Sequence, residues 1–254
     1  MKMRGLLISL TTVATLLVWL AAAPSARAEP GESLVVVELY TSQGCSSCPA
    51  ADAFLGELLE MRSDVLGLEF HVDYWDNLGW KDLFSSAEST ARQRAYAKRL
   101  GLSYVFTPQM VIDGSASEVG SNKMAVMTAI ENARARSAAR LCISVTQDAN
   151  GGLKVSLPAG TAGGGAATVW LVNFDRHFVT EVTAGENTGR MMKNNHVVRA
   201  HKAIGIWTGA PLEISLGPDQ LAGSEVSDGC AILVQSGKFG PIIGAALLWL
   251  DAES

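Results

Sequence analysis

Apolar runs and amphipathic segments alternate over the first half of the chain. The runs LVVVEL and VLGLEFHVD are short and mostly apolar, which is typical of buried strands, whereas the segments between them repeat apolar residues at helical spacing. Gly101 is a suitable helix end, and Asp113-Gly114 is a hairpin signal. The predicted elements are strand 34–39, helix 47–61, strand 65–73, helix 87–100, two strands within 105–120, and helix 121–139. Their order is β-α-β-α-β-β-α.

The pattern changes after Arg140, where short strand-like runs alternate with glycine-rich breaks. These runs cover residues 141–146, 153–157, 167–174, 196–199, 212–214, 230–235 and 242–250. Many short strands separated by turns favour an antiparallel β unit. We therefore expect an α/β domain over residues 33–140 and a smaller, antiparallel β-rich and sandwich-like domain over 141–254, packed on the first.

The N-terminal segment, residues 1–28, has the layout of a secretory signal peptide. Lys2 and Arg4 precede an uncharged apolar stretch, and the small-residue triplet Ala26-Arg27-Ala28 follows it. The alternative is a retained membrane anchor, because the apolar stretch approaches the ~20 residues that a membrane span needs. We expect cleavage after Ala28 and a periplasmic or secreted protein.

Composition limits the partners of the mature chain. Without the three basic residues of the first 28, the chain has 17 Lys and Arg against 25 Asp and Glu, a formal net charge of −8. An acidic protein is a poor match for nucleic acid, because phosphate binding depends on clustered Lys and Arg. Four cysteines in an exported protein are compatible with disulfide chemistry. We expect no nucleic acid partner, and no membrane contact after signal cleavage.

The stretch YTSQGCSSCP places Cys45 and Cys48 directly after the first predicted strand. Near the start of a helix, unpaired N–H groups and the helix dipole stabilise a Cys45 thiolate. Cys48 can then resolve a mixed disulfide, and Pro49 is tolerated in a first helical turn. A zinc site and a purely structural disulfide are the alternatives. Zinc is disfavoured because the sequence has no second C-x-x-C and no H-x₃-H.

A strand followed by C-x-x-C at a helix start, with Thr107-Pro108 opening a later strand, resembles the thioredoxin fold. The resemblance implies that Pro108 is cis and lies beside the cysteine pair. It also implies that the backbone at Thr107 pairs with an incoming peptide, and that Glu38 is a buried acid that relays protons.

A closer resemblance rests on four motifs: ELYTSQGCSSCPAAD, HVDYWDNLGWKD, YVFTPQMVIDG and GENTGR. Together they are similar to a secreted family catalogued as domain of unknown function 1223. This resemblance covers most of the mature chain and implies a thioredoxin-like fold with an additional β region. It implies no particular substrate.

The motif HVDYWDNLGW has two interpretations. In the first, Asp73, Trp75, Asp76 and Trp80 line a groove near the cysteines, because ligands gather at the carboxyl ends of strands in open sheets. In the second, which we favour, the motif is a strand end followed by a loop anchored by packed aromatic residues. Asp73 and Trp75 are the candidates for substrate binding under the first interpretation.

The segment GENTGRMMKNNHVVRAH is also open to two interpretations. It offers Asn195, His196, Arg199 and His201 as catalytic groups. We favour a solvated hairpin with a basic edge, because turn-forming residues dominate its tip.

The other two cysteines, Cys142 and Cys230, lie in strand-like runs of the second half. An even cysteine count in an exported protein predicts a structural disulfide between them. The alternative is two separate thiols buried as small hydrophobic groups.

These patterns predict a thiol–disulfide oxidoreductase. Cys45 attacks, Cys48 resolves, Glu38 assists proton transfer, and Thr107 and Pro108 position the substrate. We expect a protein or small thiol or disulfide substrate, a redox partner, no cofactor and no resident metal. The alternative function is a non-enzymatic binding protein for a partner or a soft metal such as copper(I). The sequence leaves the oligomeric state and the direction of electron flow open.

Overall fold

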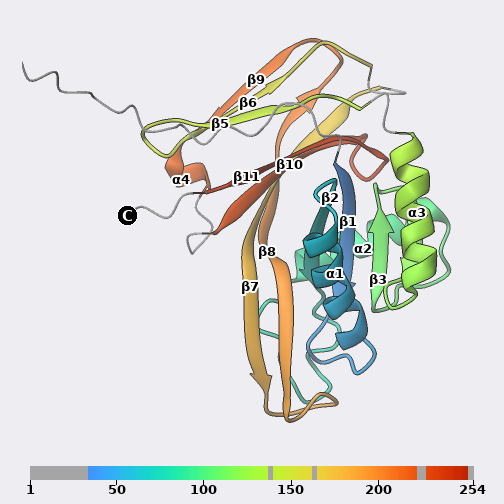
Figure 1. Ribbon diagram of the computed structural model, residues 1–254. Coiled ribbons are helices and arrows are strands. Elements are labelled where there is room, and N and C mark those ends of the chain that lie inside the picture. Colours follow the sequence, from blue (N-terminus) through green and yellow to red (C-terminus); the bar gives the residue numbers. More distant parts are fainter. Residues whose placement is uncertain (1–33, 137–139, 162–164, 222–226, 251–254) are drawn as a thin grey trace, which may run out of the picture.

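The computed structural model describes residues 34–136, 140–161, 165–221 and 227–250, so the predicted signal peptide lies outside the described residues. An eight-stranded mixed sheet has the strand order β11-β10-β7-β8-β2-β1-β3-β4, and a three-stranded antiparallel sheet has the order β5-β6-β9 (Figure 1). The elements are β1 Val35–Thr41, α1 Pro49–Met61, β2 Val65–His71, α2 Ala87–Leu100, β3 Gln109–Ile112, β4 Ala116–Val119, α3 Lys123–Ala135, β5 Ser144–Gln147, β6 Leu153–Leu157, β7 Ala167–Val182, β8 Arg190–Trp207, β9 Leu212–Leu216, α4 Pro218–Leu221, β10 Gly229–Ser236 and β11 Ile242–Trp249.

The first half of the chain has the predicted order β-α-β-α-β-β-α. Strand β1 runs parallel to β2 and antiparallel to β3. Local signals set the helix ends: Pro49 begins α1, Ser86 caps α2 by accepting the Ser89 N–H, and Gly101 ends α2 at φ 70°. The β3–β4 turn falls at Asp113-Gly114, as predicted.

The second half of the chain enlarges the same sheet, and this differs from the expected separate sandwich. Strand β8 lies parallel to β2 through the pair Glu69 and Val197, and β7, β10 and β11 follow it in the sheet. Of the described strands, β5, β6 and β9 form a separate sheet. This small sheet packs on the large one through an apolar cluster that includes Val155 and Leu171. Residues on both sides of position 140 therefore contribute to one eight-stranded sheet.

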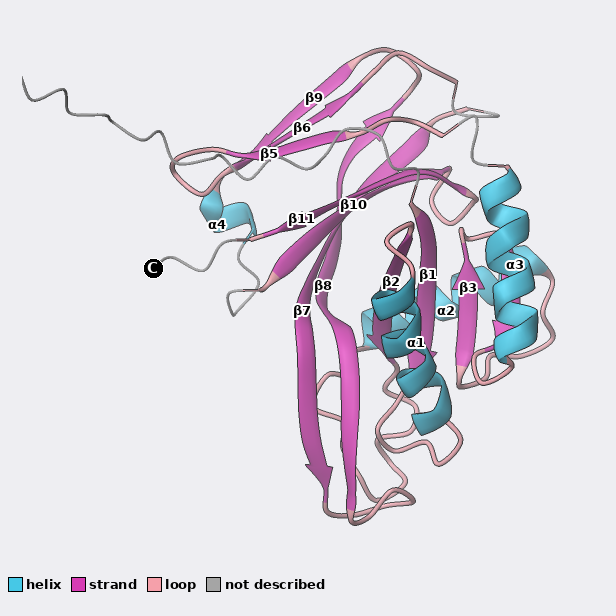
Figure 2. Ribbon diagram, in the orientation of Figure 1, coloured by secondary structure: helices cyan, strands magenta, loops and turns pink. Residues whose placement is uncertain are grey.

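The helices α1, α2 and α3 all lie beside the β1–β4 part of the large sheet (Figure 2). Alternate residues of β1 point to opposite faces. Val37 and Leu39 pack toward α1 and α3, whereas Val36 and Tyr40 share a cluster with Tyr96 of α2. Side chains near the end of β1 are thus divided between two separate surroundings. Within the described ranges, no helix combines the length and apolar character needed to cross a bilayer.

Candidate redox site

Cys45 and Cys48 form a disulfide at the end of the sheet where β1 stops and α1 begins. Their Cα atoms are 5.5 Å apart, within the usual range for a disulfide. Cys48 is the N-cap of α1, and its N–H donates to the Cys45 carbonyl at 3.2 Å. Both cysteines are 0% exposed, although Ser46 and Ser47 between them are exposed. The pair therefore lies at a helix N-terminus, where a thiolate formed on reduction is stabilised.

Hydroxyl groups surround the Cys45 sulfur. Thr107 Oγ1 donates to Cys45 Sγ at 3.3 Å, and Ser47 Oγ lies 3.3 Å from the same atom. The Trp75 indole N–H in turn donates to Thr107 Oγ1 at 2.8 Å, which directs the Thr107 proton toward the sulfur. The Thr107–Pro108 peptide bond is cis, as the resemblance implies. Thr107, Pro108 and Trp75 thus belong to the cysteine site.

The loop after β2 supports the site at several points, but Asp73 has a different role. The Asp73 carboxylate accepts the Thr90 hydroxyl at 2.6 Å, which ties this loop to α2. Trp80 donates its indole N–H to Gln43 Oε1 at 3.3 Å, two residues before Cys45. Of the aspartates and tryptophans in HVDYWDNLGW, the two tryptophans reach the cysteine site. Asp76 bonds within the loop instead, accepting the Ser85 hydroxyl.

A buried pair of carboxyl groups lies beneath α1, which the sequence interpretation missed. Asp52 follows Cys48 by one helical turn and accepts the Thr41 hydroxyl at 2.6 Å. Burial raises the pKa of Asp52 well above its usual range, and the charge of Glu69 raises it further. Burial also raises the pKa of Glu69. The raised pKa favours the protonated form of Asp52, which lies on the same face of α1 as Cys48.

His71 and Asp82 form a buried ion pair beside these acids. His71 Nδ1 lies 2.7 Å from Asp82 Oδ2, and both side chains are 0% exposed. Burial alone would lower the pKa of His71, but the Asp82 and Glu69 carboxylates outweigh it and raise this pKa to about 10. Burial opposes ionisation of Asp82, yet the charge of His71 holds its pKa below the usual range. Asp82 Oδ2 also accepts the Gln43 N–H at 2.7 Å, so the pair braces the loop that carries Cys45.

Glu38 lies on the opposite face of the sheet from α1, which argues against its predicted role in proton transfer. Arg92 Nε donates to Glu38 Oε1 at 2.6 Å, and the Tyr96 hydroxyl donates to Oε2 at 2.5 Å. The side chains of Glu38 and Arg92 are almost fully buried. Residues of β1 alternate in direction, so Glu38 faces α2 while Leu39 faces α1. The buried carboxyl groups beneath α1 are those of Asp52 and Glu69, and Asp52 is the one on the helix that begins at Cys48.

The polar residues predicted on β8 stabilise packing. His196 lies against Phe174 and Trp249, and its Nδ1 is 2.9 Å from the Gly67 carbonyl. Burial and the nearby Arg92 lower the pKa of His201 to about 4, so this histidine is neutral at physiological pH. Two further candidates have similar roles: the Asn195 N–H donates to Glu69 Oε2, and the Arg199 guanidinium lies over Phe84 and Phe178.

The predicted disulfide between Cys142 and Cys230 is wrong. Both cysteines are free; Cys142 is exposed and Cys230 is buried. Leu141 and Ile143 turn toward the apolar cluster, so the alternation of an extended chain points Cys142 the other way. Cys230, the second residue of β10, belongs to that cluster, and burial raises its pKa to about 12.

The turn between β7 and β8 contacts the site through Asn187, although most residues of the turn are exposed, as the favoured interpretation of a solvated hairpin expects. It lies at the lower end of Figure 1, beside the loop between β1 and α1. Asn187 is 0% exposed, and its side-chain amide donates to the Gln43 and Cys45 carbonyls, each at 2.9 Å. Glu186 Oε2 accepts the Ser46 N–H at 3.2 Å. The motif GENTGR pointed to a turn, but a local pattern does not indicate what a turn contacts.

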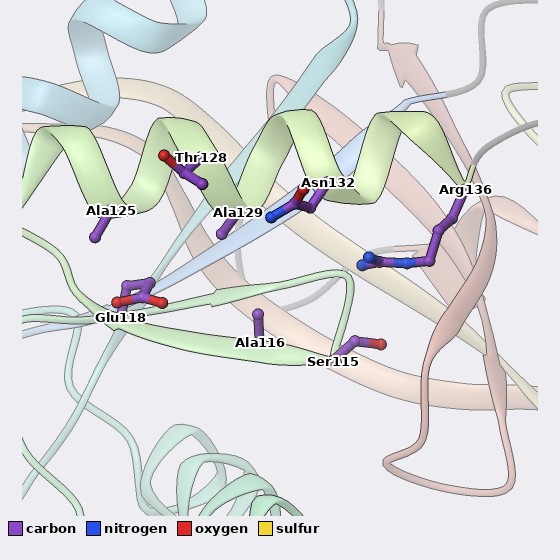
Figure 3. A pocket seen from close by; sticks show the side chains of 8 residues that line it. All are labelled: Ser115, Ala116, Glu118, Ala125, Thr128, Ala129, Asn132 and Arg136. Carbon is purple, nitrogen blue, oxygen red and sulfur yellow. The ribbon is translucent and has the colours of Figure 1, made fainter.

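A groove of about 490 Å³ lies between α3 and the β3–β4 hairpin, lined by small and polar side chains, and it shares no lining residue with the cysteine site (Figure 3). No three His, Cys, Asp or Glu side chains of the described ranges converge as a metal site. Cys45 and Cys48 alone supply two thiolates, fewer than the four ligands of a structural zinc site.

Comparisons with known proteins support a shared fold. A family model described as "Protein of unknown function (DUF1223)" matches residues 36–235. A crystal structure of a protein from Agrobacterium tumefaciens is 32% identical, with a TM-score of 0.76, over 88% of this chain and 98% of that chain. HBP35 of Porphyromonas gingivalis is 14% identical, with a TM-score of 0.60, over 88% of this chain and 77% of that chain, and shows a similar fold alone. A search of curated proteins gave no match.

Proposed function

The chain belongs to the DUF1223 family, and from the geometry of its cysteine site we propose that it is a thiol–disulfide oxidoreductase. The observation that carries this proposal is the hydroxyl cluster around Cys45 Sγ. A disulfide with only a structural role does not need donors at one sulfur, whereas a leaving or attacking thiolate does. Thr107 and Ser47 supply those hydroxyls, and Trp75 orients the first of them.

The reaction follows from the different surroundings of the two sulfurs, because hydroxyl groups lie beside Cys45 Sγ. In the reduced protein the Cys45 thiolate attacks one sulfur of a substrate disulfide, forming a mixed disulfide and releasing the other substrate sulfur as a thiolate. The Cys48 thiolate then attacks Cys45 Sγ, which forms the Cys45–Cys48 bond and releases the second substrate thiolate. Two electrons pass from the protein to the substrate. The reverse sequence oxidises a dithiol, and a redox partner restores the starting state.

Asp52 is the group that would exchange protons with Cys48. It is one helical turn from Cys48, and burial raises its pKa, which favours the protonated form. A protonated carboxyl beside a newly formed thiolate can donate to it, and the reverse transfer generates the Cys48 thiolate. In this proposal Asp52 takes the role that the sequence assigned to Glu38.

The proposal includes a thioredoxin-like core and an exported protein. The order β-α-β-α-β-β-α, the C-x-x-C pair at the start of α1 and the adjacent Thr107 support the first point. The layout of residues 1–28 supports the second, with a periplasmic or secreted protein after cleavage at Ala28.

Substitutions of the two cysteines and of Thr107 test the function. Cys45→Ser should abolish exchange with disulfide substrates, because the attacking sulfur is gone. Cys48→Ser should accumulate a mixed disulfide at Cys45 that is visible by mass spectrometry, because no thiolate resolves it. Retention of wild-type exchange rates in both variants would reject the proposal. Thr107→Val, which keeps the side-chain shape and removes the donor to Cys45 Sγ, should slow the attack without abolishing it.

A further inference from the structure

Both sulfurs of the proposed redox pair are covered. Cys45 and Cys48 are 0% exposed, whereas thiol–disulfide exchange requires a second sulfur to approach Cys45 Sγ directly. The neighbouring Ser46 and Ser47 are exposed, so the pair lies close to the surface. What covers it determines which substrates can react.

The tip of the β7–β8 hairpin, residues 183–189 and hereafter the hairpin tip, is bonded to the loop that carries Cys45. Asn187 donates from one side-chain nitrogen to the carbonyls of Gln43 and Cys45, each at 2.9 Å. Its neighbour Glu186 accepts the Ser46 N–H at 3.2 Å. Two adjacent residues therefore bond three positions, Gln43, Cys45 and Ser46, of the loop between β1 and α1, hereafter the redox loop. Asn187 is fully buried in doing so, which an ordinary turn residue is not.

The opposite side of the hairpin tip fits closely against the loop after β2. Gly185 has φ 74°, and a Cβ there would lie 3.1 Å from Trp80 Cβ. A Cβ on Gly79 would lie 3.4 Å from the Gly185 Cα. Glycine at position 185 thus allows the positive φ angle and leaves room for Trp80. Trp80 also bonds Gln43, so the hairpin tip is fixed between two segments of the site.

The backbone position that a peptide substrate would use is also occupied. The Thr107 carbonyl accepts the Ser47 hydroxyl at 3.4 Å, and the Trp75 indole N–H donates to the Thr107 hydroxyl. An extended peptide pairing with Thr107 would have to displace Ser47. A small thiol or disulfide has no such requirement.

We propose that the hairpin tip is a cover over the Cys45–Cys48 pair, held closed by Asn187, that admits small-molecule thiols and disulfides and excludes the disulfides of folded proteins. This inference rests on the proposed redox function, and it narrows the substrate class. With a small disulfide RSSR, Cys45 binds one sulfur and releases RS⁻, and Cys48 then displaces the second RS⁻. The pair loses two electrons and RSSR gains them.

The first test is independent of catalysis. The exposed Cys142 is first replaced by Ser in the wild type and in every variant. The reduced, folded protein is then alkylated at Cys45 with iodoacetamide and, separately, with a maleimide carrying a long polyethylene glycol chain. The wild type should react with the small reagent and strongly disfavour the large one. Asn187→Ala should reduce this discrimination on the order of tenfold, equivalent to about 1.4 kcal/mol, because two hydrogen bonds that close the cover are lost.

Matched variants separate opening of the cover from general destabilisation. Gly185→Ala should act like Asn187→Ala, because its Cβ would push the hairpin tip away from Trp80. Met191→Ala changes an exposed residue of the same hairpin and should leave the discrimination unchanged. Thermal melting of each variant checks folding, and Gly185→Ala keeps the test decisive if Asn187→Ala does not fold.

The second test compares substrates directly. The wild type should exchange with glutathione disulfide and not reduce insulin, and Asn187→Ala should gain insulin reduction. Equal wild-type reactivity toward glutathione disulfide and insulin would overturn the proposal that the hairpin tip is a cover. Unchanged substrate selectivity in both Asn187→Ala and Gly185→Ala would also overturn it. If no variant exchanges with either substrate but Asn187→Ala still loses alkylation selectivity, the redox function fails while the cover remains.

Discussion

Replacement of His71 by Gln tests whether the buried His71–Asp82 ion pair stabilises the loop that carries Cys45. His71 Nδ1 lies 2.7 Å from Asp82 Oδ2, and neither side chain is exposed. Asp82 also accepts the Gln43 N–H. Without the imidazolium, Asp82 would remain as a buried negative charge with no cationic partner in contact. Loss of one member of a buried pair typically costs about 3–5 kcal/mol.

The pKa of His71 gives a second, independent value for the stability that the ion pair contributes. It rises from 6.5 to about 10 on folding. At about 1.36 kcal/mol per unit, this difference corresponds to roughly 5 kcal/mol of stability at full protonation. Because the folded pKa is raised, this stability is fully present below pH 6.5 and is lost as the pH rises through 10. We therefore expect His71→Gln to lower the free energy of unfolding by about 3–5 kcal/mol at pH 6 and by much less above pH 10.

Urea denaturation of the wild type and the variant between pH 6 and pH 10.5 measures this difference. His201→Gln is the matched control, because the pKa of His201 is lowered to about 4 and its imidazole stays neutral throughout this range. Any cost of the control should be constant above about pH 7.5 and should only decrease slightly toward pH 6, where His201 of the unfolded wild type begins to bind a proton. The double variant His71→Gln with Asp82→Asn removes both charges and should be more stable than His71→Gln alone. A cost below about 1 kcal/mol, or one that is constant from pH 6 to pH 10.5, would refute the reasoning.

Three further predictions concern the other buried groups. Asp52→Asn should be more stable than the wild type by an amount that grows as the pH rises above 3.8. The reason is that the pKa of Asp52 is raised in the folded protein, so the wild type loses stability above this pH. Parallel pH profiles of the two proteins in urea denaturation would contradict this. Glu38→Gln should cost about 3–5 kcal/mol by leaving Arg92 buried and unpaired, yet leave the reduction potential of the cysteine pair unchanged; a large shift in potential would restore Glu38 to the site. Thiol titration of the denatured, unreduced protein should find two thiols, those of Cys142 and Cys230, and finding none would contradict the structure.

Local patterns predicted the individual elements well because period and turn chemistry are local properties. Pro49, Gly101 and Asp113-Gly114 fall at element ends as the sequence suggested. The joining of the two halves was not predictable in this way. It depends on the pairing of Glu69 with Val197, and nothing in either strand's own pattern identifies its partner. A set of short strands is equally compatible with a separate sandwich and with an enlarged sheet.

The same difference between local patterns and contacts between distant segments applies to the site. Spacing and neighbouring motifs identified Cys45, Cys48 and Thr107, which the structure brings together. The acids beneath α1 were missed, although each leaves a trace in the sequence. Glu69 is a charged residue within the apolar run VLGLEFHVD, and Asp52 follows Cys48 at one-turn spacing. Whether such a residue is buried depends on the elements that cover it, which come from distant parts of the chain.

The most direct test of the central claim is the reduction potential of the Cys45–Cys48 pair. The protein is equilibrated in glutathione and dithiothreitol buffers, the thiols are trapped with acid and alkylated, and the reduced fraction is measured by mass spectrometry. A catalytic pair should show one two-electron transition between about −120 and −270 mV, the range of known thiol–disulfide oxidoreductases. A potential below about −300 mV is that of a structural disulfide and would contradict the proposed function.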